Sequence, residues 1–169
     1  EVAQISYGQN LPKVLPDGVT NATNVPESQS TLLDENSSGS IVLSNSLPSL
    51  PGYSFEHWVD EKNDKNIYSP GDKVTFNTNN ETTNIKLLAV WKANNIDVTY
   101  DSNGGENPKE QNKKYVFGDN IKLEEVQKPT REGYIFQGWS TQSQASVPDL
   151  EDKQLVNFVN SRVYYAVWK

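Results

Sequence analysis

Few residues of this chain have the side-chain chemistry of a catalyst. Its 169 residues include one histidine, His57, and no cysteine. A His-based triad or a two-His metal site needs imidazoles that one residue beside Trp58 does not supply, so we interpret His57 as a partly exposed structural residue. The absence of cysteine also excludes thiol catalysis, disulfide bonds and Cys-ligated metals.

Carboxylates remain as candidates for general acid-base catalysis. Four of them flank the first Trp of the chain, namely Glu56, Asp60, Glu61 and Asp64. A catalytic pair of carboxylates needs a buried environment that separates the two pKa values. This segment is polar and is typical of an exposed loop. The sequence therefore predicts that the protein is not an enzyme.

Oxygen ligands for calcium are concentrated in Asp101–Glu106, with a second acidic group at Asp149, Glu151 and Asp152. Neither segment has the spacing of an EF-hand loop or its closing bidentate Glu. The Asn-Gly-Gly stretch within Asp101–Glu106 is explained by a tight turn, which needs residues that tolerate a positive φ. We therefore predict no metal and no cofactor.

The chain is acidic, with a formal net charge of −7. Its Lys and Arg residues are diluted among acidic ones, whereas polyanions such as nucleic acids are bound by clustered cations. No apolar run approaches the roughly 20 residues of a membrane span, and Glu1–Gln4 does not have the composition of a signal peptide. We expect no nucleic-acid partner and no membrane insertion, and we expect the chain to be part of a longer protein.

Two aromatic blocks occur twice. The segment Gly52–Trp58 returns as Gly133–Trp139, and Leu88–Lys92 returns as Tyr165–Lys169. All four Trp residues of the chain lie in these blocks. Self-similarity at a fixed period indicates a tandem array of structural units, which commonly serve as stalks, spacers or adhesive surfaces.

Period-2 alternation of apolar and polar residues predicts β-strands, for example at Val2–Tyr7 and Ile96–Tyr100. We predict a mainly β fold, α+β at most, made of two modules over residues 1–93 and 94–169. The first module carries a long N-terminal insertion, Leu11–Ser40, whose prolines favour loop or edge strand.

Helix signals are weak. The best candidate is Asp149–Val159, with a further turn expected near Glu124. In both Tyr-x-Phe-x-x-Trp blocks the Trp comes one residue later than strict alternation allows, so we expect a bend or bulge near His57 and Gly138.

Most aromatic side chains are expected in the cores rather than in ligand sites. Small modules without disulfides must bury large side chains to fold, so the repeated aromatics are predicted core residues, although they have the ring faces to stack sugars. The predicted core aromatics are Tyr53, Phe55, Trp58, Trp91, Tyr134, Phe136, Trp139 and Trp168. The aromatics that the repeat constrains less are the candidates for a contact surface: Tyr68, Tyr115, Phe117 and Tyr164.

These motifs resemble the Listeria-Bacteroides repeat family, also called internalin-type B repeats. The matching segments are Thr99–Gly105, Gly133–Trp139 and Tyr164–Trp168 in the second module, and Gly52–Trp58, Tyr68, Gly71–Asp72 and Leu87–Trp91 in the first. The first module departs at Tyr7–Asn10, where the family has Asp-x-Asn-Gly-Gly, and at His57, where Gly is usual.

The resemblance implies small β-grasp-like modules in a secreted or cell-wall-anchored bacterial surface protein. We expect a non-enzymatic stalk or spacer with weak adhesion, located outside the cell. The alternative is a dedicated adhesin module that binds a host glycoprotein or carbohydrate, which the long insertion of the first module favours. The expected partners are neighbouring repeats of the same chain and a host glycoprotein, mucin or matrix protein.

Overall fold

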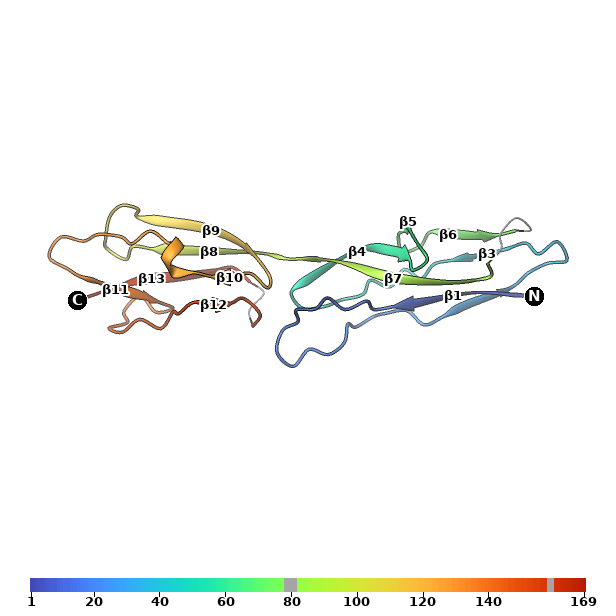
Figure 1. Cartoon of the computed structure of the whole chain (residues 1–169), viewed down its shortest axis with the longest axis horizontal. Helices are drawn as coiled ribbons and strands as arrows, with labels where there is room; N and C mark the ends of the chain where they lie inside the picture. The colour runs from blue at the N-terminus through green and yellow to red at the C-terminus, as the bar shows by residue number, and fades with distance from the viewer. Residues whose placement is uncertain (78–81, 158–159) are drawn as a thin grey trace. The chain divides into compact units, whose positions relative to one another are not determined.

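The computed structural model describes residues 1–77, 82–157 and 160–169, and it divides the chain into two compact units, Glu1–Lys92 and Ala93–Lys169 (Figure 1). We call them unit 1 and unit 2. The sequence-based boundary lies one residue later, after Ala93. Nearly all regular structure in both units is β-strand, which confirms the mainly β fold class.

Unit 1 is built on a five-stranded sheet with the order β2-β1-β7-β4-β5. Its strands are β1 (Val2–Gly8), β2 (Gln29–Leu32), β4 (Tyr53–Asp60), β5 (Asn63–Tyr68) and β7 (Asn84–Ala93). The strands β1 and β7 are parallel, whereas β1 and β2 are antiparallel. A separate antiparallel pair is formed by β3 (Gly39–Val42) and β6 (Lys73–Phe76).

The core of unit 1 lies between the sheet and this separate pair. In β1, Ala3 and Ile5 are buried while Val2 and Gln4 are exposed, as period-2 alternation requires. One cluster of buried side chains joins β1, β3, β4, β6 and β7: Ala3, Ile5, Ile41, Leu43, Trp58, Val74, Phe76, Leu87 and Ala89. The β3–β6 pair therefore covers one face of the larger sheet.

Unit 2 is built on a four-stranded sheet with the order β11-β13-β8-β9. Its strands are β8 (Asn95–Asp101), β9 (Glu110–Val116), β11 (Phe136–Ser140) and β13 (Arg162–Trp168). The parallel neighbours are β8 and β13. A short antiparallel pair is formed by β10 (Asn120–Ile121) and β12 (Lys153–Gln154), and one 3-10 turn, η1 (Leu123–Glu125), follows β10.

The two sheets have the same topology when read from corresponding edges. The order β2-β1-β7-β4 of unit 1 matches β9-β8-β13-β11 of unit 2, with the opening and closing strands parallel in both. Unit 1 adds β5 at its outer edge. It also has a longer connection between the first two strands, residues 9–28 against residues 102–109 in unit 2.

Part of the predicted insertion is regular structure. Residues 29–32 form β2, the counterpart of β9, and residues 39–42 form β3. The expectation of a loop or edge strand over Leu11–Ser40 is therefore confirmed for β2, which lies at the edge of its sheet. Most of the segment without a counterpart in unit 2 is the connection before β2.

The helix prediction over Asp149–Val159 was wrong for residues 149–157, which contain the short strand β12 and otherwise irregular backbone. The other two residues, 158 and 159, lie outside the described residues. The apolar side chains Leu150 and Leu155 are buried, so a strand-and-loop path places them in the core without a helix. The expected turn near Glu124 is confirmed by η1. The β-grasp likeness stays a prediction.

The expected bend near Gly138 is confirmed. The pairing of β11 with β13 shifts register between Phe136 and Gly138, and Gly138 has a φ of 139°. A Cβ on this residue would lie 2.8 Å from the Cβ of Pro148. Glycine is required here because both the backbone conformation and the contact with Pro148 exclude a side chain. His57, at the matching place in unit 1, has no positive φ.

Candidate functional site

Four aromatic rings of unit 2 contact one another in a row. Tyr100 meets Trp139 at a centroid distance of 5.1 Å, and Trp139 meets Phe136 at 5.1 Å. Phe136 in turn meets Trp168 at 5.7 Å. All three contacts are edge-to-face, the geometry that aromatic quadrupoles favour. The strands β8, β11 and β13 are therefore joined by one aromatic row.

Unit 1 has the same row. Tyr7 meets Trp58 at 4.8 Å, Phe55 meets Trp58 at 5.0 Å, and Phe55 meets Trp91 at 5.9 Å. Tyr7 was missed as a core residue by the sequence analysis. The signal that identifies it is its place three residues before Asn10, which matches the place of Tyr100 before Asn103.

An asparagine in the left-handed conformation ties the opening turn of each unit to its last strand. Asn103 has a φ of 49° and its side-chain amide donates to the carbonyl of Ala166 at 3.0 Å. Asn10 has a φ of 46° and donates to the carbonyl of Ala89 at 2.9 Å. The opening turn of unit 1 lacks the Gly-Gly pair, but it retains this asparagine clamp.

The closing Trp of each unit completes the clamp from the other side. The indole N–H of Trp168 donates to the carbonyls of Ser102 and Asn103, at 3.0 and 3.1 Å. The indole N–H of Trp91 donates to the carbonyl of Gln9 at 2.8 Å. These bonds satisfy polar atoms of half-buried rings, so the clamp and the aromatic row stabilise the same corner of each fold.

The predicted core aromatics occupy three environments. Trp58 and Trp139 are buried, with 0% and 3% of their surface exposed. Tyr53, Phe55, Trp91, Phe136 and Trp168 are half-buried. Tyr134 differs from its counterpart Tyr53, because 48% of its surface is exposed.

The four predicted contact aromatics also differ in burial. Tyr68 and Tyr115 are half-buried and reach the surface. Phe117 and Tyr164 are buried, with 4% and 1% exposed, so they are core residues of unit 2 and do not present their rings to a ligand. The repeat indicates this burial, because Leu87 at the place of Tyr164 is buried in unit 1 and Leu33 at the place of Phe117 packs against its core.

Buried tyrosine hydroxyls are a feature of unit 2. The hydroxyls of Tyr100 and Tyr115 lie 3.1 Å apart, and the rings of Tyr100 and Tyr164 are stacked at 6.0 Å. Burial raises the pKa of Tyr100, with the hydrogen bond to Tyr115 adding to the rise, and burial also raises the pKa of Tyr164. These phenols stay protonated at neutral pH, which suits a structural role and not proton transfer.

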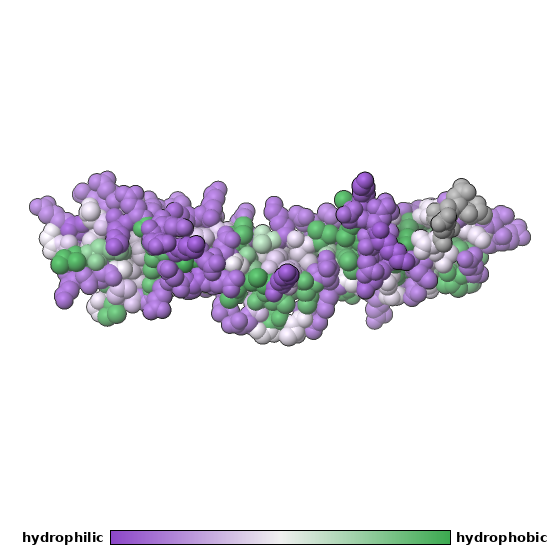
Figure 2. Space-filling view, viewed as in Figure 1, coloured by the Kyte–Doolittle hydropathy of each residue, from purple (hydrophilic) through white to green (hydrophobic). Residues whose placement is uncertain are grey.

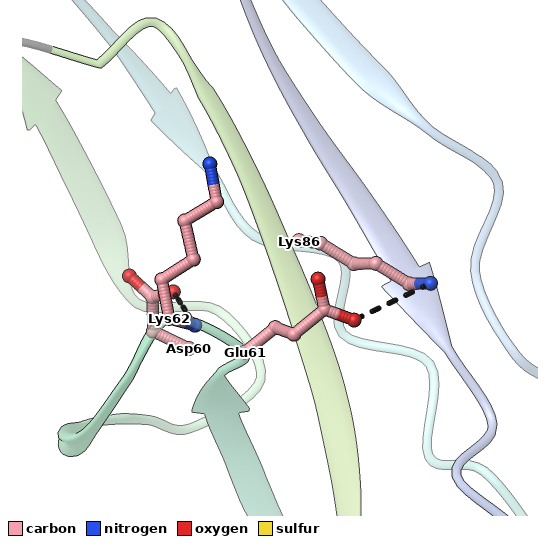
Figure 3. A network of polar contacts seen from close by, with 4 residues as sticks. All are labelled: Asp60, Glu61, Lys62 and Lys86. Atoms are coloured by element: carbon pink, nitrogen blue, oxygen red, sulfur yellow. Dashed lines mark hydrogen bonds and ion pairs between the residues drawn. The ribbon is translucent and has the colours of Figure 1, made fainter.

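Of the four carboxylates near Trp58, Asp60 and Glu61 lie at the turn between β4 and β5, beside β7 (Figure 3). Glu56 lies within β4 and Asp64 within β5. A carboxylate oxygen of Asp60 accepts the backbone N–H of Lys62 at 2.9 Å, which shapes the turn. Glu61 pairs with the ammonium of Lys86 at 3.6 Å, with both side chains about half exposed. Exposed ion pairs of this kind contribute about 0–1 kcal/mol. The geometry is that of a solvated turn.

The acidic residues considered for calcium accept hydrogen bonds from other groups of the chain. Asp101 accepts the backbone N–H of Asn103 at 2.7 Å, and Asp149 accepts the hydroxyl of Thr141 at 2.9 Å. Asp152 accepts the backbone N–H of Leu123 at 2.8 Å. Over residues 1–77, 82–157 and 160–169, no group of three His, Cys, Asp or Glu side chains is arranged to hold a metal ion.

Two comparisons place the chain among known proteins. The sequence profile of the Listeria-Bacteroides repeat domain matches residues 17–90 and 97–166. A protein of Evansella cellulosilytica that carries the provisional name of a Gly-rich membrane protein is 29% identical over 119 residues. That alignment covers 70% of this chain and 13% of the relative's own length.

The profile matches most of the chain, and its two copies fall one in each unit. Within the described residues, no helix is long and apolar enough to cross a membrane. Each matched segment contains the Phe–Trp contact at the centre of its aromatic row, Phe55 with Trp58 and Phe136 with Trp139. The chain belongs to the Listeria-Bacteroides repeat family, as two tandem copies of its repeat.

Proposed function

We propose that the two units form a non-enzymatic spacer within a bacterial cell-surface or secreted protein, with weak adhesion as a secondary property. The observation that carries the proposal is the repetition of one stabilising device, the aromatic row with its asparagine clamp, in both units. A repeated core with no repeated reactive group is typical of modules that supply length by copy number. Family membership and the name of the Evansella relative support a location at the cell surface.

The connection between the units supports the spacer role. The last strand of unit 1, β7, ends at Ala93 and the first strand of unit 2, β8, begins at Asn95. Asn94 is the single residue between them, and each residue contributes two soft dihedral angles. A linker this short restricts changes of direction between modules, whereas a long Gly-Ser linker would allow them.

The composition of the surface is consistent with a spacer. Hydrophilic residues dominate the face drawn in Figure 2 in both units, and the hydrophobic residues form small separate patches. Large exposed apolar patches mark strong protein interfaces. The low hydrophobicity therefore favours a solvated module whose contacts with host material are weak and additive over many copies.

The alternative function, a dedicated adhesin for a host glycoprotein, mucin, matrix protein or carbohydrate, is favoured by the connection before β2. This segment, however, is attached to its own unit. Thr23 and Ser49 exchange two backbone hydrogen bonds of 2.9 Å, and the hydroxyl of Tyr53 donates to the carbonyl of Val14 at 2.5 Å. The segment therefore has a structural role in unit 1, and we place the adhesin second.

The spacer is tested by a distance measurement between the units. Because the chain has no cysteine, spin labels attach cleanly to Glu27→Cys and Lys128→Cys, both at exposed positions. If the units form a spacer, pulsed electron paramagnetic resonance should show a narrow distribution of distances between the two labels. The matched control inserts Gly-Ser-Gly-Ser after Asn94 and should broaden the distribution.

A distribution of label distances that is equally broad with and without the insertion would contradict the spacer function. The adhesin is tested separately, by binding of the whole chain to arrays of glycans, mucins and matrix proteins at physiological salt. Saturable binding that disappears when residues 11–28 are shortened would place the adhesin first.

A further inference from the structure

Unit 2 leaves open a surface that unit 1 covers with its own chain. This surface consists of Arg131, Tyr134 and Ile135, which we call the Tyr134 surface. We propose that the Tyr134 surface binds an extended, proline-containing peptide segment. The proposal goes beyond the spacer function and does not depend on it.

The turn that carries Tyr134 is the same as the turn that carries Tyr53. Each tyrosine follows a glycine in the left-handed region, Gly133 with a φ of 82° and Gly52 with a φ of 88°. The backbone N–H of Tyr134 donates to the carbonyl of Arg131 at 3.1 Å, and that of Tyr53 donates to Leu50 at 3.1 Å. The two rings therefore leave equivalent turns, Tyr53 at the first residue of β4 and Tyr134 two residues before β11.

In unit 1 a proline-containing segment lies against this tyrosine. Leu11–Pro16 (Leu-Pro-Lys-Val-Leu-Pro) follows directly on the asparagine clamp, and its residues are half-buried except for the exposed Lys13. The carbonyl of Val14 accepts the hydroxyl of Tyr53. Pro12 and Pro16 bias the residues before them toward extended conformations. Unit 1 thus contains the kind of ligand that its tyrosine turn accommodates.

In unit 2 the clamp is followed instead by Gly104 and Gly105, which have no side chains to cover the tyrosine. A Cβ on Gly105 would lie 2.5 Å from the Trp168 ring and 2.8 Å from the Thr130 carbonyl, so a larger residue does not fit. The consequence is that 48% of Tyr134 is accessible. Ile135 beside it is 69% accessible, and Ser54 at the matching place in unit 1 is exposed as well.

A shallow hollow of about 560 Å³ lies beside the Gly-Gly turn, lined by Gly104, Gly105, Glu106, Asn107 and Lys109. The Cζ of Arg131 lies 3.3 Å from where a Cβ of Gly104 would be, and 3.8 Å from the centroid of the Tyr134 ring. The guanidinium therefore connects the hollow with the tyrosine. At its place in unit 1 is Leu50, which is buried.

These groups fit an extended peptide rich in proline. Such a chain has carbonyls that are not hydrogen-bonded internally and lie open to donors. Arg131 has several N–H donors and Tyr134 has a hydroxyl donor, while the ring and Ile135 provide apolar contact for proline and aliphatic side chains. The charges nearby are mixed, Arg131 and Lys109 against Glu106 and Glu132, which argues against a strongly charged ligand.

The test uses as a probe the segment of unit 1 that lies against Tyr53, Leu11–Pro16, which we call the covering segment. A fluorescently labelled synthetic peptide with the sequence of Asn10–Asp17 is titrated with the whole chain, and anisotropy is recorded up to about 1 mM chain. We expect saturable binding that Tyr134→Ala weakens at least tenfold and Arg131→Ala at least threefold. The matched control Ile67→Ala, which alters an exposed side chain of unit 1, should leave binding unchanged.

Two further measurements distinguish loss of binding from misfolding and test whether the prolines of the peptide are recognised. Tyr134→Phe retains the ring, so a severalfold loss in this variant identifies the hydroxyl even if Tyr134→Ala unfolds. A peptide with both prolines replaced by alanine should bind at least fivefold more weakly. The proposal fails if binding does not saturate, or if Tyr134→Ala and Tyr134→Phe bind as the parent chain does. It also fails if Tyr134 instead mediates a concentration-dependent dimer of the chain in sedimentation.

Discussion

The two units share a core and differ in what lies over it. Both contain the row of four aromatic rings and the asparagine clamp, with centroid distances that agree closely from one unit to the other. Unit 1 adds strand β5 and a covering segment, whereas unit 2 has a Gly-Gly turn and buried tyrosine hydroxyls. The comparison teaches that this repeat keeps its stabilising contacts constant and varies the strands and loops around them.

The largest expected effect is the loss of a buried Trp, and it tests whether the cores are equivalent. Trp58→Ala and Trp139→Ala should each destabilise their own unit by about 3–5 kcal/mol, because truncation of a buried Trp leaves a cavity. Urea unfolding of the whole chain should then show an early transition for the altered unit and an unchanged one for the other. A single transition that both variants shift equally would show that the units do not unfold separately.

The asparagine clamp gives the next largest effect. Asn103→Ala and Asn10→Ala should each cost about 1–3 kcal/mol, from a strained left-handed residue and lost hydrogen bonds. Asn→Gly at the same positions removes the strain and should recover part of the loss. Chemical denaturation measures all four variants. If Asn10→Ala is neutral while Asn103→Ala is not, the clamp of unit 1 is not equivalent to that of unit 2.

Alkaline pH should destabilise unit 2 more than unit 1. Burial raises the pKa of Tyr7, Tyr53 and Tyr68 in unit 1 too, but these side chains are only half-buried. A phenol whose folded pKa is raised is protonated more strongly in the folded state, so its contribution is complete below pH 10 and is lost as pH rises above the unfolded value. Tyr100 and Tyr164 are both 1% exposed, and burial raises the pKa of each. Unit 2 should lose stability as pH rises above 10, by at most roughly 1.4 kcal/mol per pH unit for each phenol that stays protonated in the folded state.

This sensitivity is measured by urea unfolding at pH 9, 10 and 11. Tyr164→Phe should reduce the slope for unit 2, since the variant has no phenol to ionise at that position. The prediction is contradicted if the transition of unit 2 is as stable at pH 11 as at pH 9.

The smallest effect concerns the covering segment. Tyr53→Phe removes the hydrogen bond to Val14 and should destabilise unit 1 by about 1 kcal/mol. The matched change in unit 2, Tyr134→Phe, should stay within about 0.5 kcal/mol because that residue is exposed. Thermal unfolding measures both, and limited proteolysis between residues 11 and 28 should be faster in Tyr53→Phe alone. Equal losses of stability in the two variants would contradict the inference that Tyr53 is covered and Tyr134 is not.

Much of the fold was predictable because the signals are local. Period-2 alternation predicts opening strands at Val2–Tyr7 and Ile96–Tyr100, and β1 and β8 occupy those positions with two and three buried side chains respectively. The one-residue offset before Trp139 predicts the irregularity at Gly138. The helix expected over Asp149–Val159 failed because apolar residues at mixed spacing do not specify a period, so tertiary packing of Leu150 and Leu155 decided the conformation.

The candidate contact surface was less predictable. The sequence treats Tyr53 and Tyr134 as equivalent core residues, and the structure separates them by what the rest of the chain places over each. Phe117 and Tyr164, predicted as contact aromatics, are buried instead, and so is Leu87 at the place of Tyr164 in unit 1. Burial at these positions depends on neighbours far away in the sequence, such as Val14, 39 residues from Tyr53.

By itself, the sequence determined the repeat, the β class and the two buried Trp residues at the centre of the cores, Trp58 and Trp139, because alternation and aromatic spacing act within a few residues. The tertiary structure alone decided that Asn10 and Asn103 act as clamps, since each is bonded to a last strand more than sixty residues away. It also decided which tyrosine is covered. Contacts over such distances depend on the path of the connecting chain, and local patterns do not encode that path.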